Sequence, residues 1–296
     1  MRKNTIFRGA ATALVTPFSD DGVDYDSFGR LIEWQITEGI NALVIAGTSG
    51  EGSTLTDAEH KAVLEFAVDR ANGRVPIIAG TGSNNTAYAV ELTKFACSVG
   101  CDACLVVTPY YNKTTQNGLV KTYYAIADAS TKPLILYNVP SRTGVNIEPA
   151  TYVKLAEHPN IAAIKEASGN ISKIVEEISL LDGKLDVYSG NDDQVIPLMS
   201  MGGLGVISVL SNIMPKKTAE MCSKFFAGDL KGAAAMQCEF MPLIRALFCE
   251  VNPIPAKAAV AAMGFGTGKV RLPLTDMEEG HKEKLLALMR QYGLIK

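Results

Sequence analysis

The sequence predicts an α/β protein, a (β/α)₈ TIM barrel over residues 1–228 with a C-terminal three-helix appendage over residues 229–296. Three observations support this fold class. Eight apolar runs recur in the first part of the chain, their starts are about one βα unit apart, and none alternates with polar residues. Continuous apolar runs are typical of parallel strands covered on both faces, and eight units of similar size favour a closed barrel.

The predicted strands are short apolar segments closed by polar, Gly or Pro residues. In chain order they cover residues 10–16, 42–46, 76–79, 104–108, 134–137, 161–164, 186–189 and 205–209. A doubly wound open sheet is the alternative arrangement of parallel strands. We rank it below the barrel because no G-x-G-x-x-G pattern follows the first strand.

The helices between the strands are predicted from apolar stripes at helical spacing and from signals at their ends. Thr56 and Glu59 form a capping box, so one helix begins there. Glycine often ends a helix because it readily adopts the left-handed backbone found there. Three helices are therefore expected to end shortly before a strand, at Gly39, Gly73 and Gly100.

After residue 228 the strand pattern stops. Three helices are predicted over residues 233–248, 255–263 and 276–292, separated by Pro- and Gly-rich pieces. Their apolar faces could pack on the barrel or on another subunit, and both arrangements stay open.

The composition is that of a globular protein with material for a large core. The chain has 296 residues, of which 47% are hydrophobic and 20% charged, and a net charge of −3. Without a basic cluster there is no electrostatic footprint for nucleic acid, and no apolar run reaches the roughly 18 residues of a membrane span. The N-terminus lacks a signal-peptide pattern. The six cysteines lie mostly in apolar or helical contexts, so we expect a cytoplasmic protein with reduced thiols.

Barrel active sites form at the carboxyl ends of the strands. These positions are rich in hydroxyl groups and contain a single lysine: Thr16, Thr48, Ser49, Thr81, Thr108, Tyr110, Tyr111, Tyr137, Asn138, Lys165, Glu166, Ser189 and Ser208. They lack the His and Asp clusters that would hold a metal. Cys101 and Cys104 form a Cys-x-x-Cys pair, but no second Cys or His pair follows, so we disfavour a metal site there.

Lys165 ends the sixth apolar run. An ammonium in this position is costly to desolvate, so it needs a partner or acts as a neutral amine. A neutral lysine amine forms Schiff bases with carbonyl substrates. The alternative is that its head extends into water, which is commoner for an isolated lysine. Tyr137, at the end of the neighbouring strand, could move protons during such a reaction.

Other strand-end residues suggest which substrates fit. Thr48 and Ser49 lie in a Gly-x-x-Gly turn whose hydroxyls and N–H groups could hold a carboxylate. Arg142 offers a bidentate fork for a second one, with a solvated loop arginine as the alternative. The loop after the seventh strand carries Asp192 and Asp193 without a nearby cation, which argues against a phosphorylated substrate.

Five motifs along the chain resemble those of the dihydrodipicolinate synthase branch of the pyruvate-dependent class I aldolases. They are Gly47-Thr-Ser-Gly-Glu51, Val107-Thr-Pro-Tyr-Tyr-Asn112, Tyr137-Asn-Val-Pro-Ser-Arg-Thr-Gly144, Ile164-Lys-Glu-Ala-Ser-Gly-Asn170 and Asn252-Pro-Ile-Pro-x-Lys257. The resemblance implies a lyase that condenses pyruvate with L-aspartate 4-semialdehyde to give 4-hydroxy-tetrahydrodipicolinate. This is the first committed step of diaminopimelate and lysine biosynthesis.

The resemblance also implies catalytic roles. Lys165 forms an imine with pyruvate, and Tyr137 relays protons through Thr48 and Tyr111, the last reaching in from a neighbouring subunit. No metal or organic cofactor is implied, and family members are usually homotetramers built as dimers of dimers.

Four residues are implied to bind the substrates. Thr48 and Ser49 hold the carboxylate of pyruvate, and Arg142 holds that of the semialdehyde. The backbone carbonyl of Ile207 contacts pyruvate.

The chain departs from the lysine-inhibited bacterial members of this family. Those members carry serine, histidine and glutamate where this chain has Gly52, Asp57 and Tyr88. The matching positions are His60, Asn84 and Tyr110. Because the glutamate that holds the effector's ammonium is replaced, we expect weak or no inhibition by lysine.

Two other functions stay open on the sequence. A sibling lyase, such as an N-acetylneuraminate lyase or a 2-keto-3-deoxy sugar-acid aldolase, shares the lysine and the tyrosine but typically lacks an arginine at the position of Arg142. A non-catalytic barrel that senses a keto acid is the second alternative, although every proposed catalytic residue is present.

Overall fold

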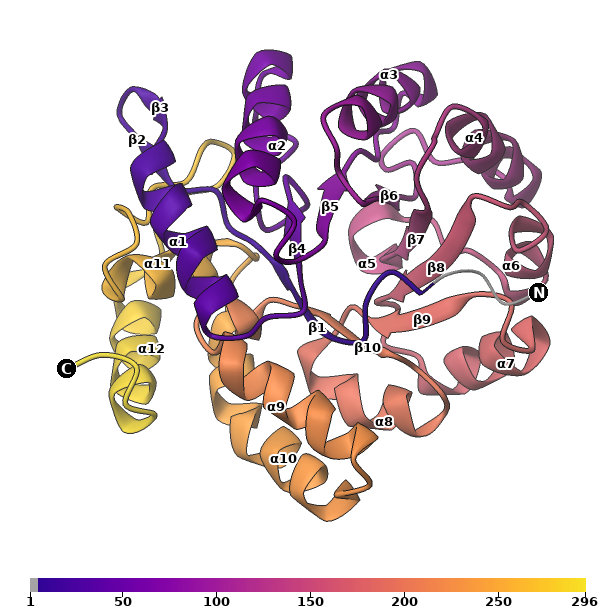
Figure 1. Cartoon of the computed structure of the whole chain (residues 1–296). Coiled ribbons are helices and arrows are strands. Elements are labelled where there is room, and N and C mark those ends of the chain that lie inside the picture. The colour runs from indigo at the N-terminus through magenta and orange to yellow at the C-terminus, as the bar shows by residue number, and fades with distance from the viewer. Residues whose placement is uncertain (1–4) are drawn as a thin grey trace.

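The computed structural model describes residues 5–296 and shows a closed barrel of eight parallel strands ringed by helices (Figure 1). The predicted fold class is confirmed. Around the barrel the strands follow the order β1, β10, β9, β8, β7, β6, β5 and β4, and β4 pairs with β1 to close the ring. Their bounds are β1 Gly9–Ala13, β4 Ala42–Ile45, β5 Ile77–Gly80, β6 Ala103–Val107, β7 Leu134–Asn138, β8 Ile161–Glu166, β9 Asp186–Ser189 and β10 Gly205–Ser208. Residues 1–4, the start of the N-terminus in which no signal peptide is expected, lie outside this range.

The helices pack around the outside of the strands. They are α1 Tyr25–Thr37, α2 Asp57–Ala71, α3 Thr86–Ser98, α4 Gln116–Asp128, α5 Pro140–Thr143, α6 Pro149–Leu155, α7 Ile171–Leu181, α8 Val195–Ser200, α9 Pro215–Phe226, α10 Leu230–Leu247, α11 Ile254–Ala262 and α12 Glu279–Gln291. The sequence did not predict the small hairpin β2 Phe18–Ser19 and β3 Gly22–Val23, the one-turn helix α5, or the 3₁₀ turns η1 Asp192–Gln194 and η2 Leu210–Asn212.

Alternation along the strands divides the apolar side chains into two cores. Leu43 and Ile45 of β4 pack outward against the helices, whereas Ala42 and Val44 face the barrel interior. Small residues fill much of the interior: Ala11, Ala13, Ala42, Ala103 and Ala163. The interior is therefore a packed core rather than a channel, and the side chains at the strand ends are left to shape a site.

The predicted helix ends are confirmed, with one refinement. The capping box of Thr56 and Glu59 begins α2, and the three terminal glycines, Gly39, Gly73 and Gly100, have φ of +84°, +68° and +95°. In α2 the left-handed backbone starts one residue earlier, at Asn72 with φ +47°, because asparagine also tolerates this conformation.

The first strand is shorter than predicted. It ends at Ala13, and the N–H of Val15 donates to the side chain of Asn212 (3.0 Å) instead of continuing the sheet. The side-chain amide of Asn212 donates back to the carbonyl of Ala13 at 2.9 Å. A long-range side-chain contact thus replaces the strand pairing that the apolar run predicted.

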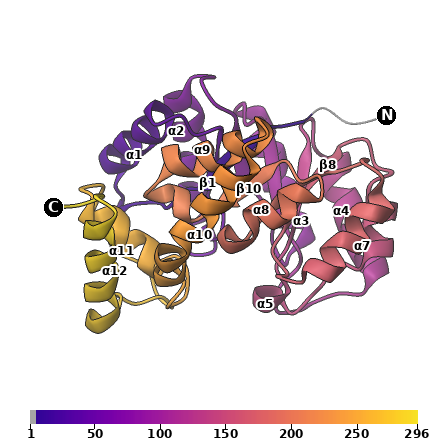
Figure 2. The same cartoon turned by 90° about the horizontal axis from the view of Figure 1, so that it is seen from below.

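Three helices follow the barrel, as predicted. Helix α10 packs on α9, and α12 packs on both α10 and α11. Figure 2 shows α11 and α12 on one side of the barrel and α4 and α7 on the opposite side. Gln237 in α10 joins this region to the barrel by donating to the carbonyl of Asp192 at 2.8 Å. The division into a barrel over residues 1–228 and a separate helical region remains an interpretation. None of the helices within residues 5–296 has the length and apolar character needed to span a membrane.

The seam between β1 and β10 is expected to be intolerant of any side chain. Gly205 pairs with Gly9, has φ +138°, and a Cβ on it would lie 1.8 Å from the carbonyl oxygen of Gly9. We expect Gly205→Ala to lower the free energy of unfolding by more than about 2 kcal/mol, measured by urea denaturation.

Gly280→Ala is the matched control. A Cβ on Gly280 in α12 meets no atom within 4 Å, so alanine should leave stability unchanged or raise it by up to about 1 kcal/mol. Equal stability of Gly205→Ala and the parent protein would contradict the account of the seam.

Candidate active site

The side chains of Lys165 and Tyr137 lie side by side at the carboxyl ends of β8 and β7. The two residues are direct register partners, and the Lys165 ammonium lies 4.2 Å from the centroid of the Tyr137 ring. Lys165 is only 5% exposed, so its head does not extend into water as the alternative interpretation required. A buried cation on an aromatic face is partly stabilised by the ring.

Lys165 and Tyr137 open onto a cavity of about 230 Å³. Hydroxyl, amide and guanidinium groups contributed by several strand-end loops line it, together with apolar side chains. The polar lining residues are Thr48, Ser49, Tyr137, Ser141, Arg142, Lys165, Asn191 and Asn252. This volume fits a small organic acid better than a large ligand.

A second cavity of about 660 Å³ adjoins the first and shares six of its lining residues, among them Thr48, Tyr137 and Arg142. It extends past Tyr110 towards His60 and Tyr88. Burial lowers the pKa of His60, whose Nε2 lies 2.9 Å from the carbonyl of Gly80. A neutral imidazole thus faces this cavity.

The turn that carries Thr48 and Ser49 folds tightly back on the end of β4. Ala46 and Glu51 have φ of +55° and +53°, and the N–H of Glu51 donates to the carbonyl of Thr48 at 3.1 Å. A Cβ on Gly52 would lie 2.2 Å from the carbonyl oxygen of Ala46. Glycine is therefore the only residue that fits at position 52 without movement of the backbone. The close approach of this position to Ala46 restricts the turn to one conformation.

A buried ion pair holds this turn to the C-terminal helices. The ammonium of Lys257 in α11 lies 2.6 Å from Glu51 and 3.8 Å from the centroid of Phe18. The second oxygen of Glu51 accepts from the N–H of Arg271 at 3.0 Å. Burial lowers the pKa of Lys257 to about 8, and the Glu51 carboxylate opposes that shift.

Asn252 contacts two of the predicted binding residues, Ser49 and Arg142. It was not itself predicted to be a site residue. Its side-chain amide donates to the hydroxyl of Ser49 at 3.0 Å, and its backbone carbonyl accepts from Arg142 at 3.1 Å. Its Oδ1 is buried and has no hydrogen-bond partner among the described residues. The motif containing Asn252 was visible in the sequence, but its spatial position was not.

Asp192 has a structural role that the sequence did not indicate. Its Oδ2 accepts from the N–H groups of Val209 and Leu210, each at 2.9 Å. Burial raises its pKa, and the nearby charge of Lys165 opposes the shift. Because a carboxylate occupies the N–H groups that follow β10, they are not free to bind a phosphate, in line with the argument against a phosphorylated substrate.

The structure brings together five of the seven predicted site residues: Lys165, Tyr137, Thr48, Ser49 and Arg142. Tyr111 lines neither cavity, is 90% exposed and has φ +70°. Ile207 is fully buried in the barrel interior and also lines neither cavity. Their proposed roles are taken up below.

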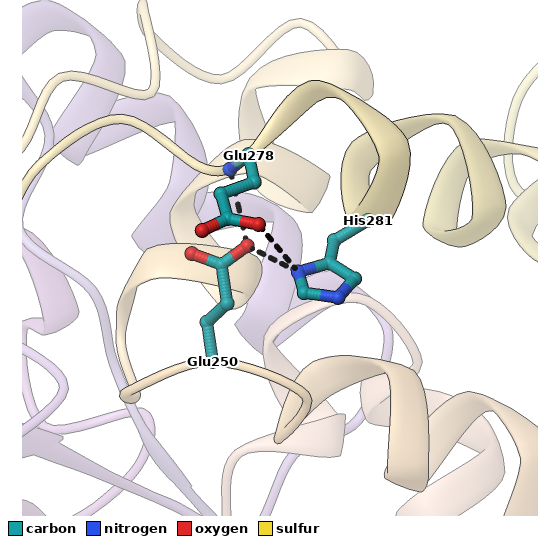
Figure 3. Close-up of side chains that lie close together, drawn as sticks. All are labelled: Glu250, Glu278 and His281. Atoms are coloured by element: carbon teal, nitrogen blue, oxygen red, sulfur yellow. Dashed lines mark hydrogen bonds and ion pairs between the residues drawn. The ribbon is translucent and has the colours of Figure 1, made fainter.

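The one cluster within residues 5–296 whose ligand atoms lie close enough to hold a metal contributes no residue to the lining of either cavity. It consists of Glu250, Glu278 and His281 (Figure 3). Glu250 accepts from the N–H of Glu278 at 3.1 Å and lies 2.8 Å from the His281 Nδ1. These contacts fix the start of α12. Cys101 and Cys104 are buried in the outer core and do not belong to the cluster.

A parallel (β/α)₈ barrel with one buried amine among hydroxyl groups at its strand ends has the arrangement of a Schiff-base aldolase. Residues 6–292 match the model of the Dihydrodipicolinate synthetase family. The chain is 55% identical over 295 residues to the 4-hydroxy-tetrahydrodipicolinate synthase of Acetivibrio thermocellus, covering 100% of both chains. We conclude that the chain belongs to the dihydrodipicolinate synthetase family.

Solved structures agree with this assignment. The dihydrodipicolinate synthase of Acinetobacter baumannii, solved in complex with pyruvate, is 48% identical with a TM-score of 0.96, over 98% of this chain and 100% of that chain. The enzyme of Cyanidioschyzon merolae, solved with lysine bound, is 40% identical with a TM-score of 0.95, over 99% of this chain and 100% of that chain.

Breaking the buried ion pair should destabilise the protein strongly. We expect Lys257→Met to lower the free energy of unfolding by about 3 kcal/mol or more, because it leaves the Glu51 carboxylate buried without its cation. Lys61→Met is the control, since Lys61 pairs with Asp57 on the surface and its loss should cost no more than about 1 kcal/mol. Similar losses for both variants in urea denaturation would refute this account.

Proposed function

We propose that this chain is a 4-hydroxy-tetrahydrodipicolinate synthase that condenses pyruvate with L-aspartate 4-semialdehyde through an imine on Lys165. The reaction is the first committed step of diaminopimelate and lysine biosynthesis. The proposal rests above all on one observation: the single buried amine of the cavity lies 4.2 Å from the Tyr137 ring centroid, in a chain that belongs to this family.

Each step of the proposed reaction uses groups at the strand ends. The Lys165 amine attacks the keto carbon of pyruvate, and loss of water gives an imine. Loss of a methyl proton then gives an enamine, whose carbon attacks the aldehyde carbon of the semialdehyde and forms the new C–C bond. The amine of the product displaces Lys165 as the ring closes, which restores the free lysine. Tyr137 exchanges protons with these intermediates.

The remaining predicted residues bind substrate or extend the proton path. Thr48 and Ser49 hold the pyruvate carboxylate, a role supported by the hydroxyl groups they present to the cavity. Arg142 holds the carboxylate of the semialdehyde, supported by its place in the lining of both cavities.

Two roles depend on the family resemblance alone. Thr48 and Tyr111 continue the proton path from Tyr137, and Tyr111 reaches the active site of a neighbouring subunit. The high exposure of Tyr111 in the single chain is compatible with that role. The second role is that of Ile207, whose backbone carbonyl contacts pyruvate.

The proposed reaction uses no metal and no organic cofactor, because the lysine imine itself activates pyruvate. The cavity lining offers hydroxyl and amide groups rather than a set of metal ligands.

Assembly of the chain into a homotetramer is also part of the proposal. So is a cytoplasmic location, which the six free cysteines support.

Borohydride trapping tests the proposal directly. With pyruvate and sodium borohydride, peptide mass spectrometry should find the reduced pyruvate adduct on Lys165 and loss of activity. Lys257 is an internal control, because it is 2% exposed and paired with Glu51, and should stay unmodified. Lys165→Ala should lower kcat by at least about a thousandfold.

Borohydride trapping and a turnover assay together separate the alternatives. Absence of an adduct on Lys165 would refute the Schiff-base mechanism and leave a keto-acid sensor. Turnover of N-acetylneuraminate in place of aspartate semialdehyde would identify a sibling lyase.

We expect lysine to inhibit weakly or not at all. Asp57 and Tyr88 face the larger cavity, and the Asp57 carboxylate is already bound by Lys61 at 2.7 Å. Tyr88 offers no charge to an effector ammonium, and Gly52 has no room for the serine side chain of lysine-inhibited members. Half-inhibition at submillimolar lysine in a steady-state assay would contradict this expectation.

A further inference from the structure

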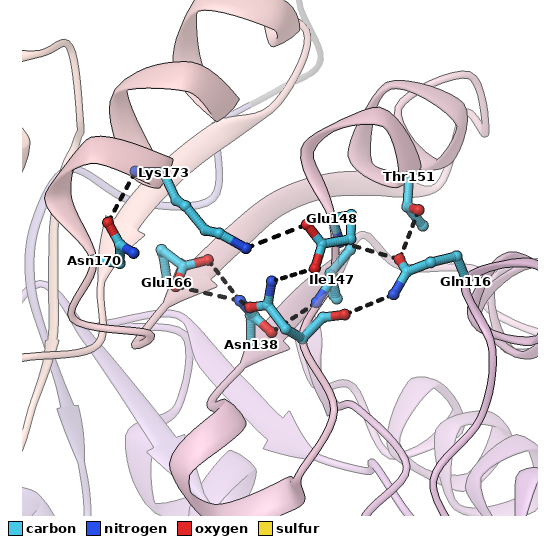
Figure 4. A network of polar contacts seen from close by, with 9 residues as sticks. Gln116, Asn138, Ile147, Glu148, Thr151, Glu166, Asn170 and Lys173 are labelled. Atoms are coloured by element: carbon cyan, nitrogen blue, oxygen red, sulfur yellow. Dashed lines mark hydrogen bonds and ion pairs between the residues drawn. The ribbon is translucent and has the colours of Figure 1, made fainter.

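Glu166 and Asn138, which each follow a proposed catalytic residue in the sequence, belong to a network of polar contacts (Figure 4). Glu166 follows Lys165 in β8, Asn138 follows Tyr137 in β7, and the two residues are register partners. Because successive strand residues face opposite sides, Lys165 and Tyr137 face the cavity while Glu166 and Asn138 face the surrounding helices.

Glu166 is fully enclosed and surrounded by donors. It is 1% exposed. Its oxygens accept from the N–H of Ser168 at 2.6 Å, the amide of Asn138 at 3.0 Å and the hydroxyl of Tyr152 at 3.0 Å. All three groups donate to it, so Glu166 serves as an acceptor-only carboxylate.

Asn138 links Glu166 in β8 to the end of β7 and to the loop that follows β7. Its amide nitrogen also donates to Asn146 at 2.9 Å, and its Oδ1 accepts from the N–H of Ile147 at 3.1 Å. The single side chain of Asn138 therefore joins the ends of β7 and β8 to the segment before α6. A displacement of Glu166 would therefore also displace the strand ends that carry Tyr137 and Lys165.

Glu177 in α7 is a second buried acid, and its pKa responds to the charge of Glu166. It is 2% exposed, and its Oε2 has no donor among the described residues. Burial raises the pKa of Glu177 to about 9, and the negative charge of Glu166 raises it further. Glu177 is therefore a neutral acid at neutral pH.

The other groups facing Glu177 do not supply a compensating charge at close range. Lys173 on the same helix lowers the pKa of Glu177 and Glu148 raises it, both less than burial does. Lys173 is itself paired with Glu148 at 3.3 Å. Burial raises the pKa of Tyr152, so its phenol stays protonated and keeps donating to Glu166.

We propose that Glu166 is a positioning residue for the reaction proposed above, holding Lys165 and Tyr137 in place through Asn138. Glu166 touches no substrate. It acts by fixing the two strand ends, and the inference rests on the proposed function of Lys165.

Two isosteric variants test this assignment because they differ in what they remove. Glu166→Gln places an amide N–H₂ among three donors, so in either orientation of the amide a donor meets a donor. We expect kcat to fall about ten- to hundredfold, with the KM for pyruvate changed less than threefold. Glu177→Gln keeps a side chain of the same size at a buried position outside the hydrogen bonds of Glu166, so kcat should stay within twofold of the parent enzyme.

Borohydride trapping on the same proteins separates this inference from the proposed function. If the parent enzyme gives no pyruvate adduct on Lys165, the proposed function fails. If the parent enzyme gives the adduct and Glu166→Gln retains full kcat, only the positioning role fails. An equal loss of kcat in both variants would also overturn it, because the loss would then not be specific to the carboxylate of Glu166.

Tyrosine variants cover the case in which Glu166→Gln does not fold. Tyr152→Phe removes one donor from Glu166 and should lower kcat a few-fold. Tyr123→Phe is the matched control, since Tyr123 is equally buried and donates to the carbonyl of Val106 (3.2 Å). It should leave kcat unchanged, and equal kcat values for the two variants would overturn the proposal.

The pH dependence of stability gives a second readout. The pKa of Glu177 is about 9 in the folded protein against 4.5 ordinarily, so the folded state binds more protons between these values. Its contribution to stability is full below pH 4.5 and is lost as pH rises towards 9. The urea midpoint should therefore fall further between pH 5 and pH 9 for the parent than for Glu177→Gln. Equal falls would refute the neutral-acid assignment.

Discussion

A charge buried away from water must be matched by its surroundings, and this protein meets that requirement differently for two lysines. Lys257 is neutralised by Glu51 at 2.6 Å, a pairing that joins two distant parts of the chain. Lys165 makes no ion pair within 4 Å among residues 5–296 and instead lies over the ring of Tyr137. Its amine is enclosed but not engaged by a carboxylate. That difference makes Lys257 a structural residue and Lys165 a candidate nucleophile.

The site depends on segments that are far apart in the sequence. The barrel supplies Lys165 and Tyr137, while the C-terminal region supplies Asn252 and Lys257, which hold the turn containing Thr48 and Ser49. Asn252 also fixes Arg142. The helices after the barrel therefore complete the cavity rather than merely covering an outer face.

The sequence predicted what is encoded locally and missed what depends on distant contacts. Strand positions follow from continuous apolar runs, and the start of α2 follows from the capping box at Thr56 and Glu59. The placement of Lys165 beside Tyr137 followed from strand order. By contrast, the roles of Asp192, Asn252 and Glu177 arise from contacts across strands or helices, which leave no periodic signal. The early end of β1 has the same origin, because Asn212 lies 197 residues beyond Val15 in the chain.

The seam at which β1 pairs with β10 also shapes how the chain folds. Gly9 and Gly205 are register partners, so one edge of β1 stays unpaired until nearly the whole barrel has been synthesised. Pairings between such distant residues form slowly, and exposed strand edges meanwhile promote aggregation. We therefore expect ring closure to be a late step of folding that waits for β10, and a chain that stops short of β10 to expose both edges of an open sheet and aggregate.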